Sequence, residues 1–143
     1  MKYLNIAFLI SAIGALPPAF AGTPVTLYRN PNCGCCNAYA DVLKGNGFDV
    51  KFVNTYDMAS IDKKFGVSGT LEGCHTAVIG NYVFEGLVPV EYVKQVVSER
   101  LPIKGLSVPG MPSGAPGMSG PKHGPIHVYY LGDSTPPRIF ASF

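Results

Sequence analysis

Hydrophobic and polar positions change their period several times along the chain, and these changes predict an α/β fold. A short β-rich run over residues 25–28 precedes a helical segment over 33–44, for which Asn32 is the expected N-cap. The glycine-rich segment 45–47 ends that helix, and alternating apolar and polar residues over 48–54 predict a half-buried strand. The start of the pattern therefore predicts a β-α-β unit.

A second helix and a hairpin follow this unit. Residues 58–65 have helical character and end before a glycine, and the glycine-punctuated loop 67–73 comes next. Two short β-rich runs, over 76–79 and 82–85, are joined by Gly80-Asn81, a dipeptide that suits a tight hairpin turn. The middle of the chain is therefore predicted to supply two neighbouring antiparallel strands.

A third helix is predicted from Pro89, which suits the first helical position, to about Arg100. Its apolar face consists of Val90, Val93 and Val97. The predicted order β-α-β-α-β-β-α, with a cysteine cluster between the first strand and the first helix, is typical of the thioredoxin fold. We therefore expect an α/β, thioredoxin-like fold over residues 24 to about 104.

The remaining segment breaks this pattern. Eleven of the 21 residues over 105–125 are Gly or Pro, and the segment repeats Pro-Gly-Met at Met111 and Met118. Such a composition forms no core of its own and predicts a loop. The β-rich runs over 126–131 and 138–143 predict a C-terminal β-hairpin that is added to the same domain.

The N-terminal segment has the features of a signal peptide. Lys2 supplies a basic start, residues 4–16 form an apolar run, and Ala19-Phe20-Ala21 is an A-x-A cleavage site. The apolar run is shorter than the roughly 20 residues that span a bilayer, so we expect cleavage before Gly22 and export to the bacterial periplasm.

The predicted organisation has three parts. They are a signal peptide over 1–21, a thioredoxin-like metal-binding domain over 22–104, and a Gly/Pro-rich loop with C-terminal strands over 105–143, packed on the same domain. The formal net charge is +2, and removal of Lys2 leaves +1. Because binding to nucleic acid needs a basic field, we expect no nucleic-acid partner. No later segment is apolar enough to span a membrane, so we expect no membrane contact after signal cleavage.

The four cysteines suggest a chemical site. Cys33, Cys35 and Cys36 lie within four positions, and Cys74 stands alone before His75. Cysteines that staple a fold are usually spread along the chain, so the clustering favours a site over a scaffold. Cys33 and Cys36 have the C-x-x-C spacing of thiol oxidoreductases, at a helix N-terminus that stabilises thiolates. Thiolates are both nucleophiles and metal ligands, so the spacing alone does not choose between these roles.

Cys74 and His75 supply the second half of the expected site. Thioredoxin-like proteins carry a proline immediately before the third strand, packed against the C-x-x-C pair, and here that place reads Cys74-His75-Thr76. The fold should therefore bring Cys74 and His75 close to the cysteine cluster. Four sulfurs and one imidazole would then face a common point.

Copper is the metal that this set favours, since soft thiolates select Cu(I), Zn(II) or iron–sulfur clusters. Zinc is less favoured and would need a closed Cys₄ or Cys₃His tetrahedron. Cys35 and Cys36 diverge by about 100° around a helix, so several Cu(I) ions sharing thiolates fit better than one ion. The candidate ligands are Cys33, Cys35, Cys36, Cys74 and His75, with Met111 and Met118 as weaker candidates.

Two other interpretations stay open. In one, the protein is a thiol-disulfide oxidoreductase in which Cys33 attacks as a thiolate and Cys36 resolves the mixed disulfide. In the other, a Cys33–Cys36 and a Cys35–Cys74 disulfide only stabilise a binding module that uses the Met-rich loop as its contact surface. Inert cysteines would identify the second case.

Together these motifs resemble the CopG-like family of small exported bacterial copper-resistance proteins. The resemblance rests on Y-R-N-P-N-C-G-C-C at 28–36, E-G-C-H-T at 72–76, P-G-M-P-S-G-A-P-G-M at 109–118, and the terminal F-A-S-F. It implies a thioredoxin-like fold and copper held by the clustered cysteines, with a possible redox change. We therefore expect a periplasmic protein of copper resistance whose partners are copper ions and other periplasmic copper-handling proteins. A copper- or thiol-linked oxidoreductase activity is left open.

Overall fold

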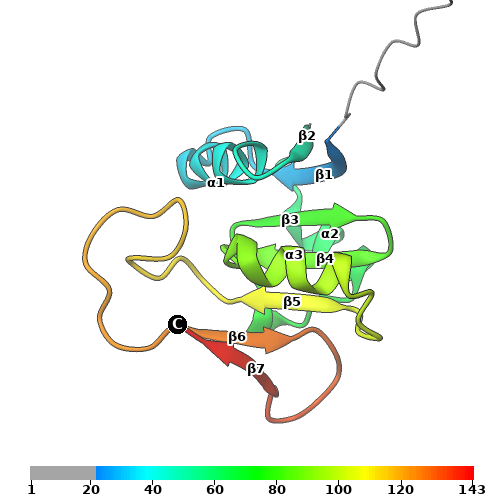
Figure 1. Cartoon of the computed structure of the whole chain (residues 1–143), viewed down its shortest axis with the longest axis vertical. Helices are drawn as coiled ribbons and strands as arrows, with labels where there is room; N and C mark the ends of the chain where they lie inside the picture. The colour runs from blue at the N-terminus through cyan, green and yellow to red at the C-terminus, as the bar shows by residue number, and fades with distance from the viewer. Residues whose placement is uncertain (1–21) are drawn as a thin grey trace, which may run out of the picture.

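The computed structural model describes residues 22–143, so the expected signal peptide over 1–21 lies outside the described residues. Three α-helices, one short 3-10 helix and seven strands follow one another along this part of the chain (Figure 1). Their bounds are β1 Thr23–Arg29, α1 Gly34–Lys44, β2 Phe48–Asn54, α2 Met58–Phe65, η1 Gly69–Leu71, β3 His75–Ile79, β4 Tyr82–Gly86, α3 Val90–Ser98, β5 Gly105–Val108, β6 His127–Tyr130 and β7 Ile139–Ser142.

All seven strands belong to one mixed sheet in the order β2-β1-β3-β4-β5-β6-β7. Strands β1 and β2 are parallel and are connected through α1, and β4 and β5 are parallel and are connected through α3. The remaining pairs, β1–β3, β3–β4, β5–β6 and β6–β7, are antiparallel. The mixed α/β class and the hairpins expected from the sequence are therefore confirmed.

The sheet separates two layers of helices. Helices α1 and α3 pack on the face that carries the larger core, while α2 and η1 cover the other face (Figure 1). One row of aligned residues crosses the first face through Leu27, Ala77, Phe84 and Leu106, all of which are buried. Burial of a large apolar side chain such as Leu27, Phe84 or Leu106 contributes about 1.5–3 kcal/mol, so this row ties the four strands β1, β3, β4 and β5 into one core.

Helix α1 begins one residue later than the sequence predicts. The expected N-cap, Asn32, lies outside the helix, and Cys33 is the N-cap residue without a side-chain capping bond. Asn30 organises the entry instead, because its side chain accepts a bond from the Asn32 amide and its carbonyl accepts one from the Cys33 amide. The N-cap prediction was wrong because the hydrogen bond from the Cys33 amide to the Asn30 carbonyl closes a turn over residues 30–33, and Asn32 lies inside this turn.

Strand β5 corrects a second expectation. Residues 105–108 were assigned to a loop, but they form a strand between β4 and β6, and all four are buried. Their sequence, Gly-Leu-Ser-Val, has only two large apolar residues and opens with a glycine, so its β character is weak. Hydrogen bonding to β4 on one side and β6 on the other therefore determines the strand conformation, and the local sequence contributes little.

The face of α3 also differs slightly from the prediction. Val93 is buried as expected, but Val96 is the second buried residue of this helix. Val90 and Val97 are only partly buried against the same core. Spacing of three residues between Val93 and Val96 places both on the same helix face.

Substitution of Val128 tests whether the C-terminal hairpin belongs to the main domain. Val128 in β6 is fully buried in the core cluster that also contains α1 and α3. We expect Val128→Ala to lower the free energy of unfolding by about 2 kcal/mol in a single denaturation transition, because two buried methyl groups are lost. Ile139→Ala on β7, where the side chain is 51% exposed, is the matched control and should cost less than about 0.5 kcal/mol. A separate transition for the hairpin would contradict this prediction.

Candidate metal centre

The first half of the centre lies at the start of α1. Cys33 and Cys36 form a disulfide with their Cα atoms 5.4 Å apart, while Cys35 is a free thiol. Cys36 is completely buried on the core side of the helix, and Cys35 is only partly buried. The two neighbouring cysteines therefore diverge around the helix, as expected from helical geometry.

Cys35 lies at the middle of the sulfur cluster. Its Sγ atom is 3.3 Å from the Sγ of Cys33 and 3.3 Å from the Sγ of Cys74. The ligand atoms of all four cysteines lie within 4.8 Å of one another. The expectation that the fold brings Cys74 to the cluster is therefore confirmed.

Cys74 and His75 come from the entry to β3. The Cys36 disulfide sulfur lies 3.5 Å from the Cys74 carbonyl oxygen, and the Cys74 sulfur lies 3.2 Å from Nδ1 of His75. His75 is fully buried, and its ring centroid is 4.7 Å from that of Tyr39. His75 thus borders the cluster through Cys74, and its Nδ1 atom is directed at the sulfurs.

The loop after β5 brings one methionine to the cluster. The thioether sulfur of Met111 is 3.8 Å from the Cys35 sulfur, and the Met111 side chain is 56% exposed. Met118 packs against the core instead, and the described part of the chain has no hydrogen bond between its sulfur and a cysteine. The two methionines of the repeat therefore occupy different environments.

A glycine holds the loop close to α1. Gly117 has φ +87°, and a Cβ atom placed there would lie 3.0 Å from the Tyr39 amide and 3.1 Å from the Cys35 carbonyl oxygen. The neighbouring Ala115 is buried in the core. The loop is therefore packed on the helix that carries the cysteines, although its composition predicts no core of its own.

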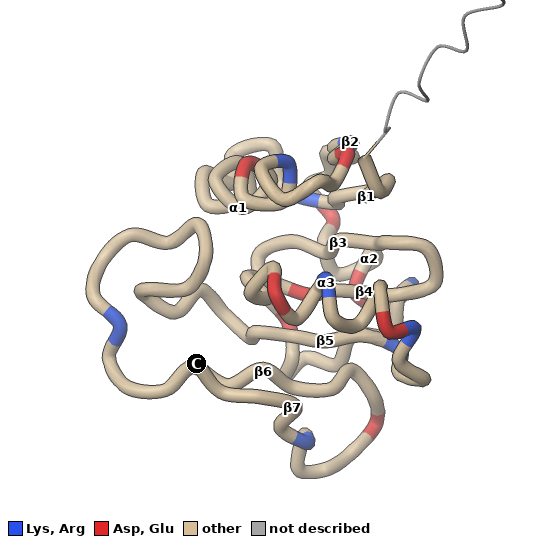
Figure 2. The backbone as a smooth tube through the Cα atoms, in the orientation of Figure 1, with Lys and Arg blue, Asp and Glu red and all other residues tan. Residues whose placement is uncertain are grey.

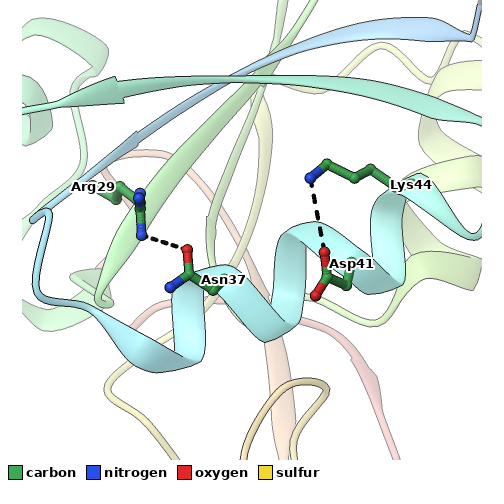
Figure 3. Close-up of polar contacts among 4 residues, drawn as sticks. All are labelled: Arg29, Asn37, Asp41 and Lys44. Atoms are coloured by element: carbon green, nitrogen blue, oxygen red, sulfur yellow. Dashed lines mark hydrogen bonds and ion pairs between the residues drawn. The ribbon is translucent and has the colours of Figure 1, made fainter.

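Polar contacts fix the exposed side of α1 relative to β1. Arg29 at the end of β1 donates a hydrogen bond from Nη1 to the Asn37 side-chain oxygen at 2.6 Å (Figure 3). One turn further along, Lys44 lies 3.7 Å from Asp41. The Arg29 guanidinium also lies 4.1 Å from the centre of the Phe52 ring. Of these contacts, the Arg29–Asn37 bond joins the end of β1 to α1 across the cysteine-bearing turn, while the Lys44–Asp41 pair lies within α1 and the Arg29–Phe52 contact lies between β1 and β2.

The surface beside the sulfurs is uncharged. An open depression there is lined by Asn30, Asn32, Cys33, Gly34, Cys35, Cys74 and Met111. Basic and acidic side chains are scattered elsewhere, and Lys122 is the only charged residue within 109–125 (Figure 2). The cluster is therefore accessible to a small cation and is not surrounded by a field of one sign.

Burial keeps both groups of the second half neutral in the metal-free protein. It raises the pKa of the Cys74 thiol well above its usual range, and the neighbouring Cys35 and Glu85 raise it further. Burial also lowers the pKa of His75 to about 4, and the nearby Gly86 backbone opposes this shift only weakly. The Nε2 atom of His75 has no hydrogen-bond partner among the described residues. A metal ion binding here must therefore replace the Cys74 proton, but it meets an imidazole that is already neutral.

A buried polar group below the site was not predicted from the sequence. Glu85 on β4 accepts hydrogen bonds from the Gly73 amide at 2.8 Å and the Thr76 hydroxyl at 2.7 Å. Asp62 on α2 lies 3.4 Å from the same hydroxyl. The signal in the sequence was a carboxylate in an otherwise apolar β-run, Tyr-Val-Phe-Glu, which the hairpin prediction left unexplained.

The unfolding free energy of the metal-free protein should depend on pH through Glu85. Burial raises the pKa of Glu85 to about 8 against its hydrogen bonds, and Asp62, Glu72 and Cys74 face it without supplying a positive charge. Between about pH 4.5 and 8, the folded state therefore binds more protons than the unfolded state. The free energy of unfolding falls as the pH rises through this range and levels off above it. Between pH 6.5 and 8.5, Glu85→Gln should gain about 1–2 kcal/mol relative to the wild type, since the titration of His75 in the unfolded chain near pH 6.5 contributes equally to both proteins.

Chemical denaturation at a series of pH values measures this difference. Ser107→Ala is the matched control, because Ser107 is a buried polar residue aligned with Glu85 that does not titrate in this range. It should shift stability by the same amount at every pH. A Glu85→Gln difference that stays constant with pH would show that this carboxyl does not titrate as described.

Of the two disulfides expected in the binding-module interpretation, the structure contains one. The Cys33–Cys36 bond is present, while Cys35 and Cys74 are free thiols whose sulfurs lie 3.3 Å apart. The site therefore contains a C-x-x-C disulfide, as an oxidoreductase would, and two further thiols, as a metal site would. Geometry alone is compatible with both kinds of chemistry.

The fold and the four clustered cysteines together define a small α/β protein with a thiol-rich centre at the start of a helix. Two solved structures of copper resistance protein copG have the same architecture. Form 1 is 33% identical, with a TM-score of 0.76, and the match covers 85% of this chain and 98% of that chain. Form 2 is 34% identical, with a TM-score of 0.76, and the match covers 84% of this chain and 97% of that chain. The chain belongs to the CopG family.

Two further comparisons complete this assignment. The family described as "Protein of unknown function, DUF411" matches residues 71–118, which include Cys74, His75 and both loop methionines. A search of curated proteins finds no match. Within residues 22–143, none of the helices has the length and apolar character needed to cross a bilayer.

Proposed function

We propose that this protein binds copper as Cu(I) through its clustered cysteines, in the service of copper resistance in the periplasm. The observation that carries the proposal is the approach of four cysteine sulfurs within 4.8 Å of one another in a chain with only four cysteines. Soft sulfur ligands favour Cu(I), and the solved relatives are named copper resistance proteins. Copper is the cargo of the site in this proposal.

Several shared copper ions fit the geometry better than one zinc ion. A tetrahedral zinc site with Zn–S bonds of about 2.3 Å would need four sulfurs spaced by roughly 3.8 Å around one point. Here Cys36 is buried on the core side of α1, while Cys35 faces the opening. Thiolates that bridge two metal ions do not need a single common centre, so a multinuclear Cu(I) cluster suits these directions. Met111 and His75 would add a thioether and an imidazole at its edge.

A redox role is the second candidate function, and the Cys33–Cys36 disulfide favours it. Oxidation of two thiolates to a disulfide releases two electrons, which can reduce two Cu(II) ions to Cu(I). The same pair could instead exchange disulfides with another protein. A thioredoxin-like arrangement, which we propose for β1 to β4 with α1 and α3, would suit this second possibility.

Anaerobic titration of the reduced mature chain with Cu(I), with free thiols counted before and after, tests the proposal. We expect more than one tightly held copper per chain and protection of the cysteines from alkylation. No retained copper, together with two thiols that cycle to a disulfide and turnover of a protein disulfide substrate, would establish the oxidoreductase instead.

The two methionines should differ in their contribution. Met111→Leu should weaken Cu(I) binding by about tenfold, because it removes the thioether beside Cys35 while keeping a similar volume. Met118→Leu is the matched control from the same repeat and should leave the affinity unchanged, since Met118 packs against the core. Competition with a Cu(I) chelator measures both variants. Equal losses would show that proximity to Cys35 does not matter.

A further inference from the structure

A fully buried carboxyl group lies directly beneath the second half of the centre. Glu85 is 0% exposed in β4, on the face of the sheet covered by α2 and η1. Within residues 22–143 it pairs with no Lys or Arg, and the ionisable groups that face it are Asp62, Glu72 and Cys74. An apolar residue would serve the stability of the sheet better, because a buried carboxyl group without a cationic partner is costly whether it is neutral or ionised. Its presence therefore calls for another explanation.

The two carboxylate oxygens bracket the dipeptide that supplies the site. Oε1 of Glu85 accepts the Gly73 amide at 2.8 Å, and Oε2 accepts the Thr76 hydroxyl at 2.7 Å. Gly73 is the residue before Cys74, and Thr76 is the residue after His75. The Glu85 side chain thus holds the backbone of Gly73 before the Cys74-His75 dipeptide and the side chain of Thr76 after it.

The strand ladder does not hold Gly73. Thr76 and Glu85 are the last aligned pair of β3 and β4, so Gly73 lies beyond the regular pairing. It crosses β4 in direct backbone contact, because a Cβ atom at Gly73 would lie 2.6 Å from the Gly86 Cα atom. The carboxylate of Glu85 reaches the Gly73 amide across this contact and replaces the missing ladder bond.

We propose that Glu85, together with Thr76, is a positioning element for the metal centre. The clamp fixes the loop so that the Cys74 sulfur lies 3.3 Å from the Cys35 sulfur and His75 Nδ1 lies 3.2 Å from the Cys74 sulfur. This inference rests on the proposed function as far as the metal is concerned. The positioning of Cys74 is a property of the metal-free chain and can be measured by itself.

The first test measures how fast Cys74 reacts with iodoacetamide in the metal-free protein with its disulfide intact, with the modified peptide located by mass spectrometry. Glu85→Ala removes both bonds and should raise the Cys74 rate by about tenfold, because the loop is no longer held in place. Glu85→Gln keeps the shape, accepts the Gly73 amide through its carbonyl and donates to Thr76, so it should stay within about threefold of the wild type. Val96→Ala, a core truncation in α3, is the control for general destabilisation.

The second test measures Cu(I) affinity by chelator competition in the same proteins. Loss of a group that orients a ligand typically weakens metal binding by about 10–100-fold, and we expect this for Glu85→Ala, with rescue by Glu85→Gln. Thr76→Val removes one of the two bonds and serves as the second variant if Glu85→Ala does not fold.

Cys74 reactivity in Glu85→Ala or Thr76→Val no higher than in Val96→Ala would overturn the clamp. A wild-type chain that holds no copper would instead overturn the proposed function, and the alkylation rates would still decide on the clamp.

Discussion

Cys35→Ser should abolish tight binding of more than one copper ion. Cys35 is the only cysteine whose sulfur lies 3.3 Å from two other cysteine sulfurs, those of Cys33 and Cys74, and its sulfur is also 3.8 Å from the Met111 thioether. A hydroxyl is a hard, neutral ligand and does not bridge Cu(I) ions as a thiolate does. We expect the copper count per chain to fall and the remaining affinity to drop by more than about 100-fold.

Copper analysis of reduced, desalted protein measures this loss. The fold should survive, because Cys35 is only partly buried and the Cys33–Cys36 disulfide does not involve it. Ser60→Ala on α2, on the opposite layer of the sheet, offers a control of comparable size that should leave copper binding unchanged. An unchanged copper count in Cys35→Ser would refute a cluster centred on this thiol.

Oxidation of the Cys33–Cys36 pair should discharge the site. In the disulfide form only Cys35 and Cys74 are free thiols, so two of the four sulfurs no longer act as thiolate ligands. We expect the fully reduced chain to hold at least two copper ions and the oxidised chain to hold at most one, with an affinity lower by about 100-fold or more.

Mass spectrometry under native conditions distinguishes these forms when the same sample is measured before and after mild oxidation. The double variant Cys33→Ser with Cys36→Ser is the control, since it lacks the same two thiolates in every sample and should hold no more copper than the oxidised wild type, even without the oxidant. Equal copper content in the reduced and oxidised wild type would mean that the disulfide pair takes no part in binding.

The sequence predicted the helices and most strands because their periodic patterns agree with their tertiary contacts. Helix α2 begins and ends where expected, since Asp57 caps its start and Gly66 its end. Strand β5 was missed because its four residues have little β propensity, and neighbours on both sides determine its conformation. Pairing partners that are distant in sequence leave no local signal.

The cysteine cluster could be predicted from the sequence, because cysteines are rare in this chain and their spacing is informative. The spacing of Cys33, Cys35 and Cys36 indicated a site, and the position of Cys74 before a strand indicated its second half. The different surroundings of Met111 and Met118 could not be predicted, because the two residues sit in the same short repeat. The path of the loop over α1 distinguishes them, and packing at Gly117 sets that path.

The role of Glu85 was also beyond sequence reasoning. A single carboxylate in a β-run is usually a solvent-facing residue on an alternating strand. Here the strand lies in the interior of a seven-stranded sheet, with α2 and η1 covering the face that Glu85 points to. Only the assembled layers show that the Glu85 carboxylate is buried next to Gly73 and Thr76.

X-ray absorption at the copper edge of the Cu(I)-loaded mature chain tests the central claim most directly, because it reports the atoms around the metal. The account predicts Cu(I) in a shell dominated by sulfur, together with copper–copper scattering from ions that share thiolates. A shell of nitrogen and oxygen atoms without a neighbouring copper would contradict a thiolate cluster built from Cys33, Cys35, Cys36 and Cys74.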